Sequence, residues 1–152
     1  MGRRYCRSSM CDHCGCREYP PIAELTADHV VILELAGRLA ADTEASRPVD
    51  HEARDRLLPL LRSHAAKEEL GLYALLIAQG EAEEGAYDHL EGEHREVMDA
   101  IEAGRFGHLE HYALQRHIEE EEEGLFTRST FWFDGDTWDR MTEAHRRVDA
   151  AT

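Results

Sequence analysis

The sequence predicts an all-α protein, an antiparallel up-down-up-down four-helix bundle with a short C-terminal helix. Three observations predict this fold class. Apolar residues recur at helical spacing through most of the chain, in segments of roughly twenty residues. Short turns separate the segments, which favours antiparallel neighbours. Alanine, leucine, glutamate and arginine are abundant and favour helix, and no segment of strand period is long enough to compete.

The first two helices are expected over residues 22–41 and 49–78. Pro20 and Pro21 precede the first and suit an opening turn, where a missing N–H costs little. Pro59 falls inside the second and should kink or split it. The apolar face of this pair comprises Leu25, Ile32, Leu35, Ala36, Leu39, Leu57, Leu58, Leu61, Ala65, Leu72, Leu75 and Leu76.

Two further helices are expected over residues 83–103 and 108–126. A last short helix, about residues 137–148, would begin at an Asp136 cap and dock on the bundle. The expected core residues here are Leu90, Val97, Met98, Ile101, Leu109, Tyr112, Leu114, Trp138 and Met141.

These elements divide the chain into a Cys-rich tail (residues 1–19), a bundle (residues 20–130) and a C-terminal part (residues 131–152). All four cysteines lie in the tail, at Cys6, Cys11, Cys14 and Cys16. Such tight spacing suggests thiol or metal chemistry rather than a disulfide framework. Zinc or another soft metal at Cys11, His13, Cys14 and Cys16 is one interpretation; a redox sensor and an idle tail are the others.

Composition bounds the class of partner. The formal net charge is −15, which disfavours nucleic acid and anionic membranes because both need neutralising lysines and arginines. No apolar run of about 18 residues predicts a membrane span, and the basic start lacks the apolar stretch of a secretory signal. We therefore expect a cytoplasmic protein with no nucleic-acid or membrane partner.

An internal repeat carries the candidate chemistry. The second and fourth helices both read His, three residues, Glu-Glu, one residue, Gly-Leu-aromatic, beginning at His64 and His117. The first and third helices share an acid followed by histidine, at His29 and His94. A bundle with approximate two-fold symmetry would bring these four histidines together.

The spacing has a physical meaning. Residues four apart on a helix lie one turn above each other, so His64 can share a metal with Glu68, and His117 with Glu121. Glu122, five residues after His117, should point elsewhere. These donors suit iron, zinc and manganese and are a natural set for two ions bridged by carboxylates. In the alternative interpretation, the two His/Glu pairs are exposed and only stabilise their helices, and the two single histidines are hydrogen-bonded core residues. His145 is expected at the surface.

The chain resembles the hemerythrin-like (HHE cation-binding) domain family over roughly residues 22–130. The resemblance is carried by His29, His64-x3-Glu68, Glu93-His94-Arg95, and His117-x3-Glu121 followed by Leu125-Phe126. It implies a non-haem centre of two iron ions with an oxo or hydroxo group between them. The implied ligands are His29, His64, Glu68, His94, His117 and Glu121, with Glu68 and Glu121 bridging. Family members bind dioxygen, sense oxygen or iron, or react with peroxide or nitric oxide.

This chain departs from the oxygen-carrying members, which have five histidine ligands with a pair four residues apart in the third helix. Here Leu90 stands four residues before His94, and His89 lies off that face. Sensing, detoxification or redox turnover is therefore favoured over oxygen carriage. Whether the protein is an enzyme stays open; if so, it would be a di-iron oxidoreductase reacting with peroxide or dioxygen. The alternative function is a metal-responsive module, binding iron or zinc and signalling to a partner through its Cys-rich tail.

Overall fold

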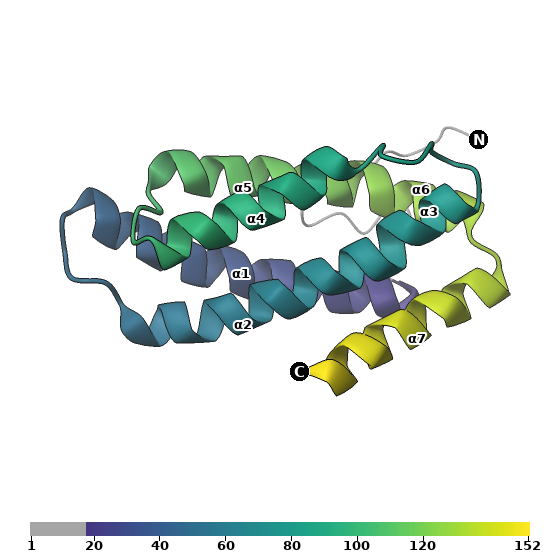
Figure 1. Ribbon diagram of the computed structural model, residues 1–152, viewed down its shortest axis with the longest axis horizontal. Helices are drawn as coiled ribbons and strands as arrows, with labels where there is room; N and C mark the ends of the chain where they lie inside the picture. The colour runs from purple at the N-terminus through teal and green to yellow at the C-terminus, as the bar shows by residue number, and fades with distance from the viewer. Residues whose placement is uncertain (1–17) are drawn as a thin grey trace.

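The computed structural model describes residues 18–152, and within that range the chain is helical and has no strand (Figure 1). This confirms the predicted fold class. None of the helices in the described range is long and apolar enough to cross a membrane. The elements are α1 (Pro20–Glu44), α2 (His51–Lys67), η2 (Glu68–Tyr73), α3 (Ala74–Ala78), α4 (Asp88–Glu102), α5 (His108–Glu120), η3 (Glu121–Leu125), α6 (Phe126–Trp132) and α7 (Gly135–Ala151).

Four helical rods form the bundle: α1, α2–η2–α3, α4 and α5–η3–α6. We call the first two rods the first half and the last two the second half. α1 packs against α2 and α5, and α4 packs against α2 and α5. α7 lies outside the bundle against α1, α2 and η2, on the side away from α4 and α5 (Figure 1).

Two apolar clusters occupy the interior, separated along the bundle by a polar layer. On α1, Leu25 belongs to one cluster and Ile32 to the other, with His29 between them. On α4, Leu90 and Val97 flank His94 in the same way. The apolar clusters therefore enclose the histidine layer from both ends.

The helix ends follow local chemistry, with one correction to the sequence prediction. Pro20 and Pro21 occupy the first turn of α1, as predicted. α7, however, begins earlier than expected, because Asp134 and not Asp136 is its cap: the Asp134 carboxylate accepts a hydrogen bond from the Thr137 N–H at 2.8 Å. The start of α1 also meets α7, since Tyr19 stacks on Trp138 with ring centroids 4.0 Å apart.

Three other expectations need correction. Pro59 does not split its helix, because α2 runs unbroken from His51 to Lys67; Pro59 and Asp55 are both exposed, so water can reach the carbonyl that loses its partner. Leu109 and Tyr112 are 81% and 62% exposed rather than core residues. They lie five and two positions before the buried Leu114, and 3.6-residue periodicity turns both away from its face.

The regular helices widen at two equivalent places. The second and fourth rods each contain a π-helical segment, η2 and η3, beginning at Glu68 and Glu121. These are the repeated Glu-Glu sequences of the two halves. Wide turns inside α-helices occur frequently at functional sites, and here they coincide with the polar layer.

Candidate metal centre

The polar layer brings together the six residues singled out from the sequence, and we call it the metal centre. Two groups of four buried side chains have donor atoms within 4.8 Å of one another. Both groups share Glu68 and Glu121. The His29–His64 position adds His29 and His64, and the His94–His117 position adds His94 and His117.

Each half contributes its residues in the same way. α1 and α4 each supply one histidine, while α2 and α5 each supply a histidine one turn before the glutamate that opens the π-helical segment. The ring centroids of His29 and His64 are 4.7 Å apart, and those of His94 and His117 are 4.6 Å apart. The internal repeat of the sequence is therefore a repeat in space.

The imidazole rings point their Nε2 atoms inward. His64 Nε2 lies 2.8 Å from Glu68 Oε1, and His94 Nε2 lies 3.0 Å from Glu68 Oε2. His117 Nε2 lies 3.2 Å from Glu121 Oε1, and His29 Nε2 is 3.4 Å from a carboxylate oxygen of each glutamate. Eight donor atoms thus converge from four helical rods.

Outward, each ring donates its Nδ1 proton to a second carboxylate. Such a partner fixes the ring orientation and strengthens an imidazole as a metal ligand. In each half, the acidic residue that precedes the first histidine accepts the Nδ1 proton of the second histidine of the same half. The second glutamate of each Glu-Glu pair accepts the Nδ1 proton of the first histidine of the other half. The Nδ1 contacts are His64 to Asp28 at 3.2 Å, His117 to Glu93 at 2.7 Å, His94 to Glu69 at 2.8 Å and His29 to Glu122 at 2.8 Å.

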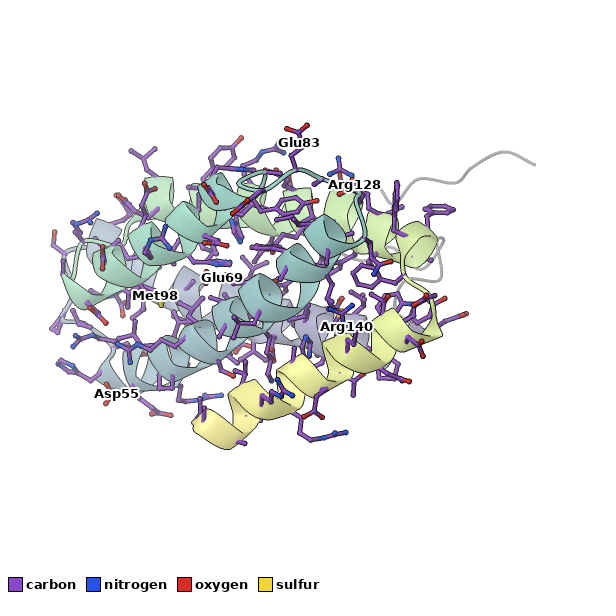
Figure 2. The ribbon with its side chains drawn as sticks, turned by 45° about the vertical axis from the view of Figure 1, so that its right-hand side comes forward. Asp55, Glu69, Glu83, Met98, Arg128 and Arg140 are labelled. Carbon is purple, nitrogen blue, oxygen red and sulfur yellow. The ribbon has the colours of Figure 1, made fainter. Side chains whose placement is uncertain are left out.

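Glu122 is the clearest correction to the sequence reasoning, which pointed it away from the centre. It is buried and holds His29, because the π-helical segment changes the helical phase that the five-residue spacing assumed. Glu69 likewise accepts the Nδ1 proton of His94, midway along the bundle between η2 and α4 (Figure 2). The doubled glutamate in both repeats was the signal that could have revealed these partners.

Glu122→Gln is expected to lower metal affinity by about 10- to 100-fold, the usual effect of removing an outer carboxylate from a ligating histidine. Glutamine keeps the shape but loses the charge beside His29 Nδ1. Metal affinity measured by competition with a chelator checks this. Glu123→Gln, on the exposed neighbouring residue, is the matched control and should bind as the unmodified protein does; equal losses in both variants would contradict the prediction.

The surroundings of the four imidazoles favour their protonated form. Burial lowers the pKa of each imidazole, but hydrogen bonds and nearby carboxylate charges outweigh it. The pKa values rise to about 10 for His94 and about 8 for His117, and above the ordinary value for His29 and His64. Without a metal ion, protons supply the positive charge that the buried carboxylates require.

The two shared glutamates stay ionised. Burial raises the pKa of Glu68, yet the surrounding imidazoles hold it well below its usual range. Burial and the Glu68 charge raise the pKa of Glu121, and its imidazole neighbours lower it overall. Both Glu68 oxygens, Glu121 Oε2 and His29 Nε2 are buried, and their contacts of 2.8–3.4 Å with one another and with the other imidazoles do not have hydrogen-bond geometry. Buried polar atoms left in this way are what a bound cation would satisfy, so the residues fit a metal.

Equivalent aromatic side chains close the centre at one end. Phe126 stacks on His29 and Tyr73 on His94, with centroid distances of 5.8 and 6.1 Å. Only the tyrosine can donate a hydrogen bond, and its hydroxyl donates to Glu121 Oε1. Burial and the charges of Glu121 and Glu68 raise the pKa of Tyr73, which keeps it a donor. Here the two halves differ by one hydroxyl.

Tyr73→Phe is expected to lower the free energy of unfolding by about 1.5–3 kcal/mol, since it deletes a buried hydrogen bond to an ionised carboxylate. It should also weaken metal binding, because Glu121 loses its fixed orientation. Chemical denaturation and chelator competition measure the two effects. Tyr87→Phe is the control: its hydroxyl donates to Glu81 at 2.6 Å, outside the centre. A Tyr87→Phe variant with equally weakened metal binding would contradict a specific role for Tyr73.

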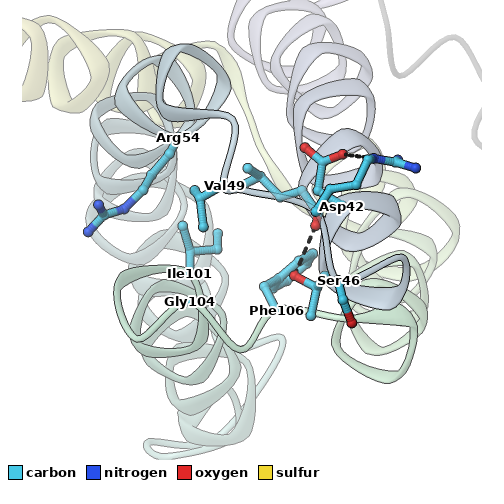
Figure 3. Close-up of a pocket in the computed structure, with 10 residues that line it drawn as sticks. Asp42, Ser46, Val49, Arg54, Ile101, Gly104 and Phe106 are labelled. Atoms are coloured by element: carbon cyan, nitrogen blue, oxygen red, sulfur yellow. Dashed lines mark hydrogen bonds and ion pairs between the residues drawn. The ribbon is translucent and has the colours of Figure 1, made fainter.

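The remaining candidates lie apart from the centre. His89 is 52% exposed and pairs with Glu120 at 2.9 Å. His145 is buried rather than at the surface and pairs with Glu24 at 2.8 Å. A cavity of about 210 Å³ lies at the far end of the bundle, where the α1–α2 and α4–α5 turns meet (Figure 3), and it contains no residue of the centre. Cys11, His13, Cys14 and Cys16 lie outside the described residues.

A four-helix bundle with two overlapping His/Glu groups defines a class of protein, the cation-binding helical bundle. The comparison with family models agrees, since the model described as Hemerythrin HHE cation binding domain matches residues 20–129. The chain belongs to this family. No curated protein and no solved structure matches it significantly.

Proposed function

We propose that this protein binds two iron ions side by side in the metal centre and uses them to bind or react with dioxygen, peroxide or nitric oxide. One observation carries the proposal: two groups of four donors overlap at Glu68 and Glu121. Carboxylates common to both groups suit a bridged pair of ions better than one ion, because eight donor atoms exceed the roughly four to six that one zinc or iron ion takes.

The residues of this chain determine the ligands and the surroundings of such an iron pair. His29, His64, His94 and His117 would hold the ions from four rods, with their ring orientations fixed by the outer carboxylates. Apolar clusters on both sides exclude bulk water. An iron pair supplies redox chemistry toward small oxygen or nitrogen ligands.

The histidine count favours sensing, detoxification or redox turnover over oxygen carriage. His89 points to solvent and pairs with Glu120, while Leu90, one turn before His94, belongs to the apolar core. The centre therefore has two imidazoles for each metal position, within the described part of the chain. Fewer fixed ligands leave more coordination places for an exchanging small molecule.

The test is metal content per chain by elemental analysis, with the visible absorption spectrum of the protein loaded anaerobically with Fe²⁺ and then oxidised. Two irons per chain and the absorption of an oxidised iron pair would support the proposal. One zinc, or no bound iron after loading, would overturn it.

A second assay separates turnover from sensing. Peroxide consumed in many equivalents per chain would support an oxidoreductase. Consumption that stops at stoichiometric amounts, with a large melting shift on metal loading, would favour the metal-responsive module instead, since a ligand that binds only the folded state stabilises it.

A further inference from the structure

The two metal positions have equivalent donors but unequal surroundings. Each position has two imidazoles and the same two carboxylates, so ligand type does not distinguish them. Their Nδ1 partners are also equivalent, with Asp28 on His64 and Glu93 on His117. Besides the Tyr73–Phe126 difference, the two positions differ in what covers them from outside.

α7 covers the side of the His29–His64 position. It packs on α1, α2 and η2, the elements that carry this position (Figure 1). A Cβ added at Gly71 of η2 would lie 3.5 Å from Met141 Cγ and 3.5 Å from His145 Cδ2. The ion pairs His145–Glu24 and Lys67–Asp149, both 2.8 Å long, hold α7 in place. Gly71 is buried beneath it.

The equivalent place in the second half is open. A Cβ added at Gly124 of η3, which corresponds to Gly71 in the repeat, would meet nothing within 4 Å. Thus the C-terminal helix breaks the two-fold symmetry of the bundle by covering one half alone.

Cavities gather on the open side. Two surface cavities, of about 280 and 500 Å³, are both lined by Glu93 and His117. A recess of only about 10 Å³, lined by Leu61, Val97 and Leu114, touches Glu93 and His117 but also His94 and His64, so it does not distinguish the two positions. The Glu93 side chain is 42% exposed, against 22% for its counterpart Asp28. His117 thus lines both surface cavities itself, beside the Glu93 carboxylate that accepts its Nδ1 proton.

We propose that the His94–His117 position is the one that exchanges its metal and its small ligand with solvent, and that Glu93 controls this exchange as a positioning residue. The His29–His64 position is the closed one, held beneath α7. Glu93 controls the exchange through His117. Its carboxylate fixes the His117 ring by accepting the Nδ1 proton, and its side chain lines both surface cavities. This inference rests on the proposed two-metal centre.

The test is release of iron from the anaerobic, Fe²⁺-loaded full-length protein to an excess of a chromogenic ferrous chelator. The expected result is two phases of equal amplitude, one ion each. Glu93→Ala should accelerate the fast phase by about 10-fold or more, the scale of losing an outer carboxylate, and leave the slow phase unchanged. Asp28→Ala should act on the slow phase alone.

Glu96→Ala is the matched control. Glu96 lies one turn after Glu93 on α4 and lines the same 280 Å³ cavity, but it does not contact His117. The substitution removes the same charge, so both release phases should stay as in the unmodified protein. A single release phase, a Glu93→Ala effect on the slow phase, or no effect at all would overturn the inference, as would a Glu96→Ala effect equal to that of Glu93→Ala. Fewer than two ions per loaded chain would instead count against the proposed function.

Discussion

Replacing either Glu68 or Glu121 by alanine is expected to abolish binding at both metal positions, not at one. Each glutamate belongs to both donor groups, so one substitution removes a shared ligand. The loss of affinity should exceed the roughly 100-fold upper effect of an outer-carboxylate substitution. Elemental analysis after loading would find well under one ion per chain, where the unmodified protein holds two.

Two controls separate loss of the ligand from loss of the fold. Alanine favours helix, so circular dichroism of the metal-free variants should show unchanged helical content. His111→Ala tests position: His111 packs beside Gly37 and Phe106, away from both donor groups, and its loss should leave metal content unchanged. An emptied centre in His111→Ala, or one ion retained in Glu68→Ala, would contradict shared ligation.

Metal-induced stabilisation is expected to increase steeply with pH between 6 and 8. Metal ions must displace protons from imidazoles whose pKa values lie at about 8 for His117 and about 10 for His94, and above the ordinary value for His29 and His64. Each proton released contributes about 1.4 kcal/mol per pH unit to the difference between loaded and metal-free protein. Thermal unfolding of both forms at several pH values measures this.

The metal-free protein should show the opposite trend. Because the folded imidazoles have pKa values above the unfolded value of about 6.5, their stabilising contribution is complete below that pH. It is lost as the pH rises through about 8 and then about 10. A difference between loaded and metal-free protein that stays flat from pH 6 to 8 would contradict proton displacement. The exposed His89 serves as control, since His89→Ala should not change the slope.

Much of the fold could be predicted because helical periodicity and short turns are local properties of the sequence. The ends of α7 and the exposure of Leu109 were less predictable. Asp134 and Asp136 are both suitable N-cap residues, and only the path of the surrounding chain determines which of them begins the helix. Leu109 is apolar, but its exposure depends on a phase of α5 that Leu114 and Ile118 set through their packing.

The repeat allowed the six residues of the centre to be singled out together, although their ligation of metal stays a prediction. Two of the outer carboxylates, Glu69 and Glu122, could not be placed, because a straight α-helix was assumed through both Glu-Glu sequences. The π-helical segments turn Glu69 and Glu122 toward His94 and His29. Tyr73, the aromatic residue that ends the first copy of the repeat, is buried in the core and also donates a hydrogen bond to Glu121.

The two wide turns also affect how the chain tolerates a change of length. A π turn closes hydrogen bonds from residue i to i+5 and so contains one residue more than the α turn that it replaces. Deleting one residue from η3, such as Gly124, would restore regular α-helix while α5 and α6 kept their rotational phase. The apolar clusters on both sides could then assemble as before, whereas Glu122 would no longer reach His29. A single-residue deletion would in this way separate the ability to fold from the ability to hold metal.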